Sequence, residues 1–349
     1  MLGLFGKKPG SLLGIDIAAT SVRLLALSRQ GRAHQVEAYA CEPRAVGREQ
    51  PDSEALAAVL SRAWRHSGSR LKAVAVALPG EALIDKLIEV PAGLSGAELE
   101  LQVELEAAQH IPYPLEDAAM DFAVLGPLPD NPSRMQLLLV ACRNEDVEAL
   151  ETSLAQAGLE PQVVDSEILA LERCLAMLVP QLSLAPHCAL ALLDIGEDVS
   201  QFRVMHELQL IYGREQLFGS RQLAQALERD CSLTLDQAVL AERRNLLPQS
   251  CLEQVLQSFE EQLLQHLHRA LQLFAESPQR RSIELLLLAG AGSRLAGLAQ
   301  RVAARVGIAT VIADPFVGMS VADQVDAEAL AHQAPNLLLA CGLALRGFD

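Results

Sequence analysis

The pentapeptide LGIDI (residues 13–17) near the start of the chain is echoed by LLDIG (residues 192–196) past its middle. Each is an apolar run that ends in a carboxylate and small residues, a pattern typical of a buried parallel strand that runs into a tight turn. Two such units facing one another can hold a polyphosphate and its metal ion between them. Although buried strands also end in Asp by chance, the pair predicts two related halves with a nucleotide site.

The composition narrows the class of partner. Half of the 349 residues are hydrophobic, which is enough to bury the cores of two or more domains. The chain carries 28 Lys and Arg against 44 Asp and Glu, a net charge of -16. Because nucleic-acid affinity depends on basic residues that neutralise phosphates, we expect no nucleic-acid partner and favour proteins or small molecules.

The cysteines and the apolar runs indicate the compartment. The seven cysteines include no C-x-x-C pair, which favours small core residues in a reducing compartment over a disulfide framework or a zinc site. No apolar run approaches the ~18 residues that a membrane-spanning helix needs. The start, MLGLFGKKP, lacks the h-region of a signal peptide. We therefore expect a cytoplasmic protein.

The order of predicted elements repeats. The first half opens with strands at 12–17, 22–28 and 35–40, a helix at 53–66 and a strand at 73–78. A compact unit with its own strands and helices then intervenes, and the first half resumes at 163–165 with a helix through 178. After a linker at 180–186 the meander recurs at 188–212, followed by helical sequence at 219–276 and a strand at 283–288. This internal symmetry is typical of the actin-like ATPase architecture.

The first turn has the residue types that a phosphate site requires. Asp16 precedes small and hydroxyl-bearing residues whose successive N–H groups can form an anion-binding nest. Arg23 follows and can add a charge-assisted contact. Asp16 would hold Mg²⁺ through water, because magnesium keeps much of its hydration shell. The other predicted contacts in this turn are Ala18, Ala19, Thr20 and Ser21. A plain β-hairpin with a surface Arg is the alternative.

The second turn is more acidic. Asp194 and Gly196 keep the pattern and would hold metal and phosphate, but Glu197 and Asp198 stand where phosphate-binding turns favour Thr, Ser or Gly. A carboxylate about 4 Å from a phosphate oxygen costs on the order of 4 kcal/mol at an effective dielectric near 20. Either Glu197 points away or nucleotide binds weakly.

Two further segments carry candidate residues. The loop after the strand at 283–288 is rich in glycine and opens a helix, so its N–H groups suit an adenosine site. Its candidates are Gly290, Ala291, Gly292, Ser293 and Leu295. Asp165 and Glu167 precede the helix at 168–178, where Glu167 could orient a water on a γ-phosphate. The alternative is a helix cap with acids in the first turn.

Seven long segments resemble the PilM family of type IV pilus assembly proteins. They are LLGIDIAATSVRLLALS (12–28), VEAYACEP (36–43), ELEAAQHIPYPLEDAAMDFAVLG (104–126), LLVACRNEDVE (138–148), AGLEPQVVDSEILALER (157–173), GREQLFGSRQL (213–223) and APNLLLACGLALRGFD (334–349). The chain departs from the family at Glu197 and Asp198, and it has Ala289-Gly290 where relatives carry a Gly-Gly pair.

The resemblance implies an α/β, actin-like ATPase fold with two lobes and an FtsA-type insertion. The first lobe would comprise 11–73, 165–185 and 334–349, the inserted small domain 74–164, and the second lobe 186–333 with a helical insertion at 220–278. ATP and Mg²⁺ would bind between the lobes, with Ser200, Gly213, Glu242 and Arg243 among the cofactor contacts. The N-terminal cytosolic tail of PilN would dock in a groove between the first lobe and the inserted domain.

The resemblance therefore implies a nucleotide-binding cytoplasmic scaffold with at most weak ATPase activity. It would sit on the cytoplasmic face of the inner membrane through PilN and link the alignment proteins to the pilus motor and platform proteins, with homo-oligomerisation left open. The alternative is a small-molecule phosphotransferase or hydrolysing ATPase of the same superfamily. A third reading, an FtsA-like membrane filament, needs a C-terminal amphipathic helix, whereas this sequence finishes with Arg346-Gly347-Phe348-Asp349.

Overall fold

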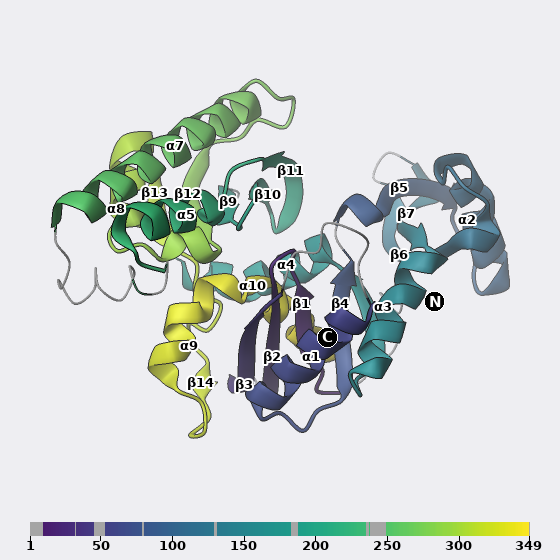
Figure 1. The fold of residues 1–349 in the computed structure, drawn as a ribbon. Helices are drawn as coiled ribbons and strands as arrows, with labels where there is room; N and C mark the ends of the chain where they lie inside the picture. Colours follow the sequence, from purple (N-terminus) through teal and green to yellow (C-terminus); the bar gives the residue numbers. More distant parts are fainter. Residues whose placement is uncertain are drawn as a thin grey trace. The chain divides into compact units, whose positions relative to one another are not determined.

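A computed structural model describes residues 10–31, 33–44, 53–78, 80–128, 131–182, 188–234, 237 and 249–348. The chain forms two compact units, whose elements are labelled in Figure 1. Unit 1 consists of Met1–Leu171, Ser320–Val325 and Leu339–Asp349, and unit 2 of Glu172–Met319 and Asp326–Leu338. The chain crosses from one unit to the other within α4 (Glu167–Leu178) and α10 (Leu338–Leu345), and also before and after Ser320–Val325.

Unit 1 is built on a six-stranded sheet with the order β14-β3-β2-β1-β4-β8. Its strands are β1 (Leu13–Ile17), β2 (Ser21–Gln30), β3 (Ala33–Pro43), β4 (Ala73–Leu78), β8 (Glu160–Ser166) and β14 (Ser320–Val321). The first three form the predicted antiparallel meander, and β4 lies parallel to both β1 and β8. The carboxyl ends of β1, β4 and β8 therefore meet at one edge of the sheet.

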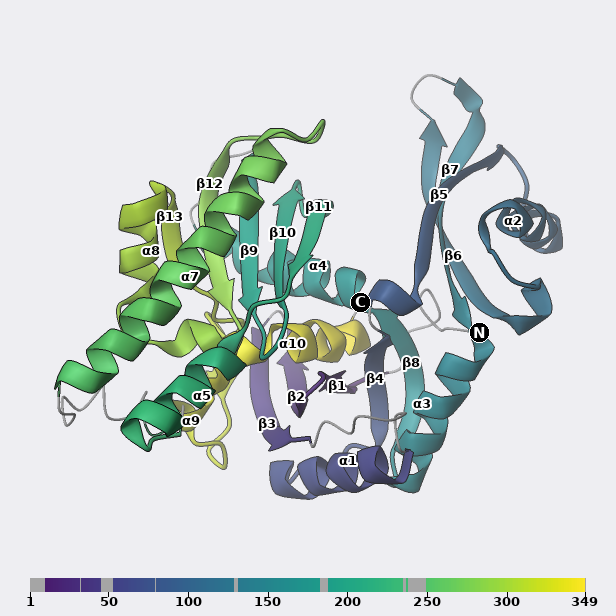
Figure 2. The ribbon, with the colours of Figure 1, turned by 45° about the horizontal axis from the view of Figure 1, so that its top comes forward.

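Helices cover both faces of this sheet, as Figure 2 shows. On one face, α1 (Ser53–Ser67) buries an apolar stripe, including Leu56 and Leu60, and α3 (Asn144–Gln156) packs beside it. On the other face, α4 and α10 share a small core with strand residues such as Ala75. This double cover explains why β1 and β4 are apolar on both sides rather than alternating.

Backbone meets backbone where α10 crosses β1. A Cβ atom added to Gly14 would lie 2.2 Å from the Ala340 carbonyl oxygen, and one added to Gly342 would clash with the Ala170 carbonyl oxygen of α4. Both contacts are closer than any side chain permits. Glycine at these two positions thus lets α10 pack directly onto its neighbours.

The intervening unit has its own three-stranded sheet, with the order β5-β7-β6. The strands are β5 (Ile84–Pro91), β6 (Ala118–Leu128) and β7 (Asn131–Arg143), and α2 (Ala97–His110) covers one face through Val103 and Ala107. The expected division at 74–164 is wider than this sheet. Residues 74–78 and 160–164 lie in β4 and β8, which pair in the six-stranded sheet, so the separate sheet spans only 84–143.

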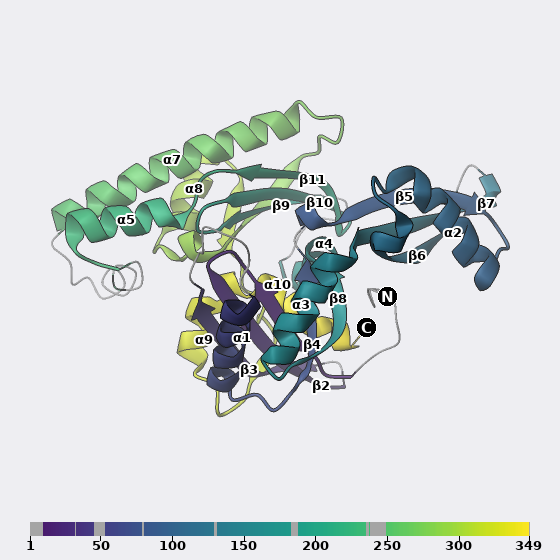
Figure 3. The ribbon, with the colours of Figure 1, turned by 45° about the vertical axis from the view of Figure 1, so that its right-hand side comes forward.

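Unit 2 holds a five-stranded sheet with the order β11-β10-β9-β12-β13; β9, β10 and β11 are labelled in Figure 3. Its strands are β9 (Ala189–Ile195), β10 (Ser200–His206), β11 (Gln209–Gln216), β12 (Ile283–Ala289) and β13 (Ala309–Ile312). The predicted helical sequence contains α5 (Ser220–Cys231) and α7 (Gln249–Ala275), while α8 (Leu298–Val306) follows the glycine-rich loop. The apolar stripe of α7, including Phe259, Leu263 and Leu267, lies in the core.

A tight hairpin joins two neighbouring strands of unit 2. The hairpin between β10 and β11 turns at Glu207 and Leu208, whose φ angles of 51° and 65° are unusual for residues other than glycine. This turn delays β11, which begins at Gln209 rather than at the expected 207. Among the described helices, none combines the length and the apolar character that crossing a bilayer requires.

Candidate functional site

Asp16 stands at the carboxyl end of β1 and is held by Arg23 of β2. The two residues are cross-strand partners in the antiparallel register, and the Arg23 Nη1 atom lies 2.9 Å from Asp16 Oδ2. The carboxylate side chain is only 6% exposed, whereas that of Arg23 is 16% exposed. Arg23 thus compensates a carboxylate that burial would otherwise penalise strongly.

The backbone of the first turn presents amide groups. The Ala18 N–H closes the turn by donating to the Ser21 carbonyl over 2.9 Å. No described residue accepts a hydrogen bond from the amides of Ala19 and Thr20. Adjacent amides without protein acceptors are the feature that anion-binding turns share.

A second buried carboxylate lies at the same sheet edge. In the parallel registers Ile15 pairs with Val76 and Ala77 with Asp165, so Asp16 and Asp165 stand at the same level, two strands apart. Two strand spacings amount to roughly 10 Å between their Cα atoms. Asp165 is 1% exposed. The sheet therefore places two carboxylates at one edge of unit 1.

Glu167, the candidate for orienting a water, is the first residue of α4 and is half-buried. The hydroxyl of Ser166 accepts from the Ile168 amide at 3.2 Å, and the Asp165 carboxylate accepts from the Ser166 amide at 2.8 Å. These contacts match the alternative interpretation of this segment as a helix cap.

The second turn is anchored to α5 by its carbonyl groups. The amides of Ser220 and Arg221, in the first turn of α5, donate to the carbonyls of Gly196 and Glu197, each over 2.9 Å. In the described part of the chain, the amides of residues 196–199 meet no acceptor. The carbonyls of Gly196 and Glu197 are thus bonded to α5, whereas the amides of the turn have no acceptor among the described residues.

The two unexpected acids of this turn are paired with one cation. Arg221 binds the Asp198 carboxylate through two hydrogen bonds, of 2.5 Å from Nε and 2.7 Å from Nη2. Its Nη2 atom also lies 3.4 Å from Glu197 Oε1. The hydrogen bond from Arg221 lowers the pKa of Asp198, which keeps that carboxylate charged.

The glycine-rich loop lies against the second turn. Ala289 at the end of β12 pairs with Asp194 at the end of β9. The next residue, Gly290, has φ 79° and ψ 174°, a region that only glycine occupies readily. A Cβ atom there would lie 2.4 Å from both Asp194 Oδ1 and the Ile195 carbonyl oxygen. The fold thus brings Asp194, Gly196 and the loop together within unit 2.

Some candidate residues have structural partners instead. The Ser200 hydroxyl donates to the Phe218 carbonyl at 2.7 Å, and the Ser293 hydroxyl donates to the Gly290 carbonyl at 2.8 Å. Both side chains are buried. Gly213 lies in the edge strand β11, opposite Arg203 and remote from the turn in register.

The remaining candidates are divided between the loop and the core. Ala291 and Gly292 belong to the short helix η4 (Ala291–Arg294), whereas Leu295 is a core residue of unit 2. Gly292 packs against Ile195, whose Cγ2 atom would lie 2.4 Å from an added Cβ. Glu242 and Arg243 lie outside the described residues.

The donor set suits magnesium better than a metal with an all-protein cage. The described residues contain no group of three or more His, Cys, Asp or Glu able to hold a metal ion together. Asp16, which is paired with Arg23, and Asp194 each lie at the end of a strand. Mg²⁺ is commonly held in this way, by one or two carboxylates with water and substrate phosphates as its other ligands.

A family model described as type IV pilus assembly protein PilM matches residues 14–348. The chain belongs to the PilM family. Its fold agrees with that of a solved "PilM-PilN type IV pilus biogenesis complex", with 27% identity, a TM-score of 0.73, and coverage of 97% of this chain and 99% of that chain.

A second solved structure shows the breadth of the fold. The ethanolamine utilization protein EutJ from Carboxydothermus hydrogenoformans is 14% identical, with a TM-score of 0.53 over 98% of this PilM-family chain and 92% of the EutJ chain. At that identity the likeness concerns the fold alone. The predicted α/β fold of the actin-like ATPase class is confirmed.

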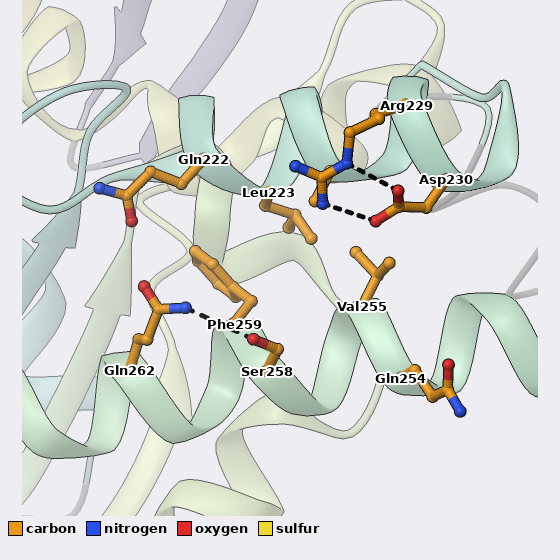
Figure 4. A pocket seen from close by; sticks show the side chains of 10 residues that line it. Gln222, Leu223, Arg229, Asp230, Gln254, Val255, Ser258, Phe259 and Gln262 are labelled. Carbon is orange, nitrogen blue, oxygen red and sulfur yellow. Dashed lines mark hydrogen bonds and ion pairs between the residues drawn. The ribbon is translucent and has the colours of Figure 1, made fainter.

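A cavity of about 210 Å³ lies between α5 and α7 of this PilM-family chain (Figure 4). Leu223, Val255 and Phe259 form its apolar part, and glutamine side chains stand around it. At one end Arg229 binds the neighbouring Asp230 through two hydrogen bonds of 2.7 Å. Phe259 also lies beneath Gly292, so the cavity shares a wall with the glycine-rich loop.

Sequence reasoning gave too little weight to two residues of this PilM-family site. Asp165, rather than Glu167, shares the sheet edge with Asp16, and the signal was an apolar run ending in Asp, as in the opening pentapeptide. Arg221 was missed because it lies 23 positions beyond Asp198. Only the fold places these two side chains together.

Proposed function

We propose that this PilM-family chain is a cytoplasmic scaffold of type IV pilus assembly that docks the N-terminal cytosolic tail of a PilN protein. In this role it links the membrane-embedded alignment proteins to the cytosolic motor. The likeness to a PilM chain solved in complex with PilN supports the choice of partner. The observation that carries the proposal is an apolar row on the sheet of the inserted unit.

The row lies on the sheet face opposite α2. Leu87 of β5, Leu138 of β7 and Ala123 of β6 are register partners and therefore point to the same side. Leu87 is 60% exposed. Leu138 also borders the core that the sheet shares with α1 and α3, so the row runs toward the first lobe, where the docking groove is predicted.

The charged residues beside the apolar row indicate which residue types a bound tail would carry. Asp85 and Glu89 flank Leu87 on the same face of β5, where Arg134 of β7 pairs with Glu89 over 3.2 Å, and Asp121 lies next to Ala123 on β6. An apolar row bordered by carboxylates favours an extended, apolar segment that carries Lys or Arg.

A matched pair of leucine substitutions tests this proposal. Leu87 and Leu101 are 60% and 59% exposed, but Leu101 lies on α2, away from the row. We expect Leu87→Ser to weaken binding of a synthetic PilN-tail peptide by roughly tenfold or more, because burying a leucine stabilises by about 1.5–3 kcal/mol. Leu101→Ser should bind as wild type does. Equal losses in both variants, or none in Leu87→Ser, would contradict the proposed surface.

We further propose that the chain binds ATP with Mg²⁺. In unit 1 the amides of Ala19 and Thr20 would contact phosphate beside Asp16, and in unit 2 the amides of residues 196–199 would do so beside Asp194, each carboxylate being a candidate ligand of the hydrated metal ion. The ion supplies positive charge that offsets the phosphate groups. Binding would then change the affinity for the tail by shifting populations of conformations.

Calorimetric titration of Mg-ATP into wild type and Asp16→Asn tests nucleotide binding. We expect wild type to bind and the substitution, or EDTA, to weaken binding about tenfold or more, since the carboxylate charge that attracts the metal is lost. Absence of binding by wild type would leave a scaffold that uses no nucleotide. A peptide affinity that Mg-ATP leaves unchanged would rule out the coupling alone.

A further inference from the structure

The second turn of unit 2 contains two carboxylates where a phosphate would add more negative charge. Glu197 and Asp198 lie between β9 and β10, beside the amides of residues 196–199 that meet no described acceptor. An unscreened carboxylate about 4 Å from a phosphate oxygen would weaken binding by up to about a thousandfold at an effective dielectric near 20. A turn of this composition needs compensation before it can accept an anion.

Arg221 supplies a positive charge at this place. Its guanidinium grips Asp198 through two hydrogen bonds and reaches Glu197 at 3.4 Å. With Arg221 present, the three side chains carry a net charge of about -1 instead of -2, and arginine keeps its charge at any physiological pH. The paired geometry also fixes where the Asp198 carboxylate points.

The backbone holds the arginine and the acids in a fixed relation. The Arg221 amide donates to the Glu197 carbonyl, and the preceding amide, of Ser220, donates to the Gly196 carbonyl. These bonds fix the turn against the first residues of α5, so the backbone of Arg221 is held at a fixed distance from Glu197 and Asp198. The carboxylates are thus held on the side of the turn that faces α5.

We propose that Arg221 is a positioning residue for phosphate: it draws Glu197 and Asp198 onto α5 and leaves the amides of residues 196–199 open to a nucleotide phosphate. The inference rests on the proposed binding of ATP and extends it to a residue outside the turn. It also explains how an acidic sequence serves as a phosphate-binding turn.

The same helix provides a matched control. Arg229 binds Asp230 through two hydrogen bonds of 2.7 Å, a pair of the same chemistry eight residues further along α5. This pair lies near the other end of α5. Loss of Arg229 therefore reports the general cost of removing an arginine from α5, and loss of Arg221 adds the effect at the turn.

The test is calorimetric titration of Mg-ATP into the full chain and four variants. We expect Arg221→Ala to bind roughly tenfold or more weakly and Arg229→Ala to bind as wild type does. Glu197→Gln combined with Asp198→Asn should bind at least as tightly as wild type. Adding Arg221→Ala to that acid-free variant should change its affinity by no more than about twofold, because no charge remains to be compensated.

These outcomes separate positioning from a merely structural role. If Arg221 only fastened α5 to the turn, its removal would weaken the acid-free variant as much as the wild type, and the inference would be overturned. Unchanged binding by Arg221→Ala would overturn it too, as would weaker binding by the acid-free variant, since the acids would then serve the ligand. Should Arg221→Ala fail to fold by circular dichroism, the acid-free variant still decides. Failure of wild type to bind Mg-ATP would instead defeat the proposed nucleotide function itself.

Discussion

Substitution of Gly290 by alanine tests the packing of the glycine-rich loop against the second turn. Two separate costs arise. The φ and ψ angles of 79° and 174° lie in a region that costs a residue with a side chain about 1–3 kcal/mol. The added methyl group would also lie 2.4 Å from both Asp194 Oδ1 and the Ile195 carbonyl oxygen, and such overpacking typically costs about 1–3 kcal/mol.

Gly307 is the matched control for this change. It also has a positive φ, 72°, at the end of α8, but no atom lies within 4 Å of the Cβ that alanine would add. Gly307→Ala should therefore lower the free energy of unfolding only through the backbone conformation, by about 1 kcal/mol. We expect Gly290→Ala to lower the free energy of unfolding by about 2–5 kcal/mol, well beyond the control.

The assay is thermal unfolding followed by circular dichroism and scanning calorimetry, which resolves separate transitions where the two units unfold independently. For a unit of this size, 1 kcal/mol shifts the midpoint by about 2–4 °C. The transition of Gly290→Ala should thus fall by roughly 5–15 °C, and that of Gly307→Ala by a few degrees. Equal shifts in the two variants would refute the close approach of Asp194 to the loop.

Three other changes test individual contacts. Arg23→Met should lower the free energy of unfolding, measured by chemical denaturation, by about 3 kcal/mol, because it leaves the buried Asp16 carboxylate without its ion pair. Arg62→Met, at a more exposed ion pair, should lower it by less than about 1 kcal/mol, and equal losses would contradict this ranking. Burial raises the pKa of Glu172 above 4.5, so wild type loses stability relative to Glu172→Gln as pH rises through the raised value. A difference between the unfolding midpoints of the two proteins that stays constant from pH 4 to 8 would contradict this shift. Burial, followed by a nearby aspartate, raises the pKa of Cys142 to about 11, so native protein at pH 8 should resist iodoacetamide at this thiol until it unfolds, as peptide mass mapping would show.

The sequence predicted the elements that local patterns specify. The bounds of β4 were predicted in full, and those of α1 to within one residue, because apolar periodicity and caps lie within the segments themselves. The twin strands that end in Asp16 and Asp194 also appear as expected. The actin-like class follows from the order of these elements.

The misplaced boundaries and the missed residues depend on pairing between distant segments. No local pattern states that β8 joins β4 rather than the inserted sheet, so the division at 74–164 cut through two strands. The sequence likewise shows two acids at the second turn but not the arginine that binds them. Nor does it show that the hydroxyls of Ser200 and Ser293 donate to the carbonyls of Phe218 and Gly290.

The glycine contacts of α10 have a mechanical consequence. Where Gly14 and Gly342 bring main chain against main chain, no flexible side chain lies between the surfaces to absorb a small displacement. Helices that slide past one another during domain motions do so by switching side-chain rotamers at their interface. The contacts of α10 with β1 and α4 contain no side chains that could switch in this way. These three elements must therefore either move together as a rigid body or separate.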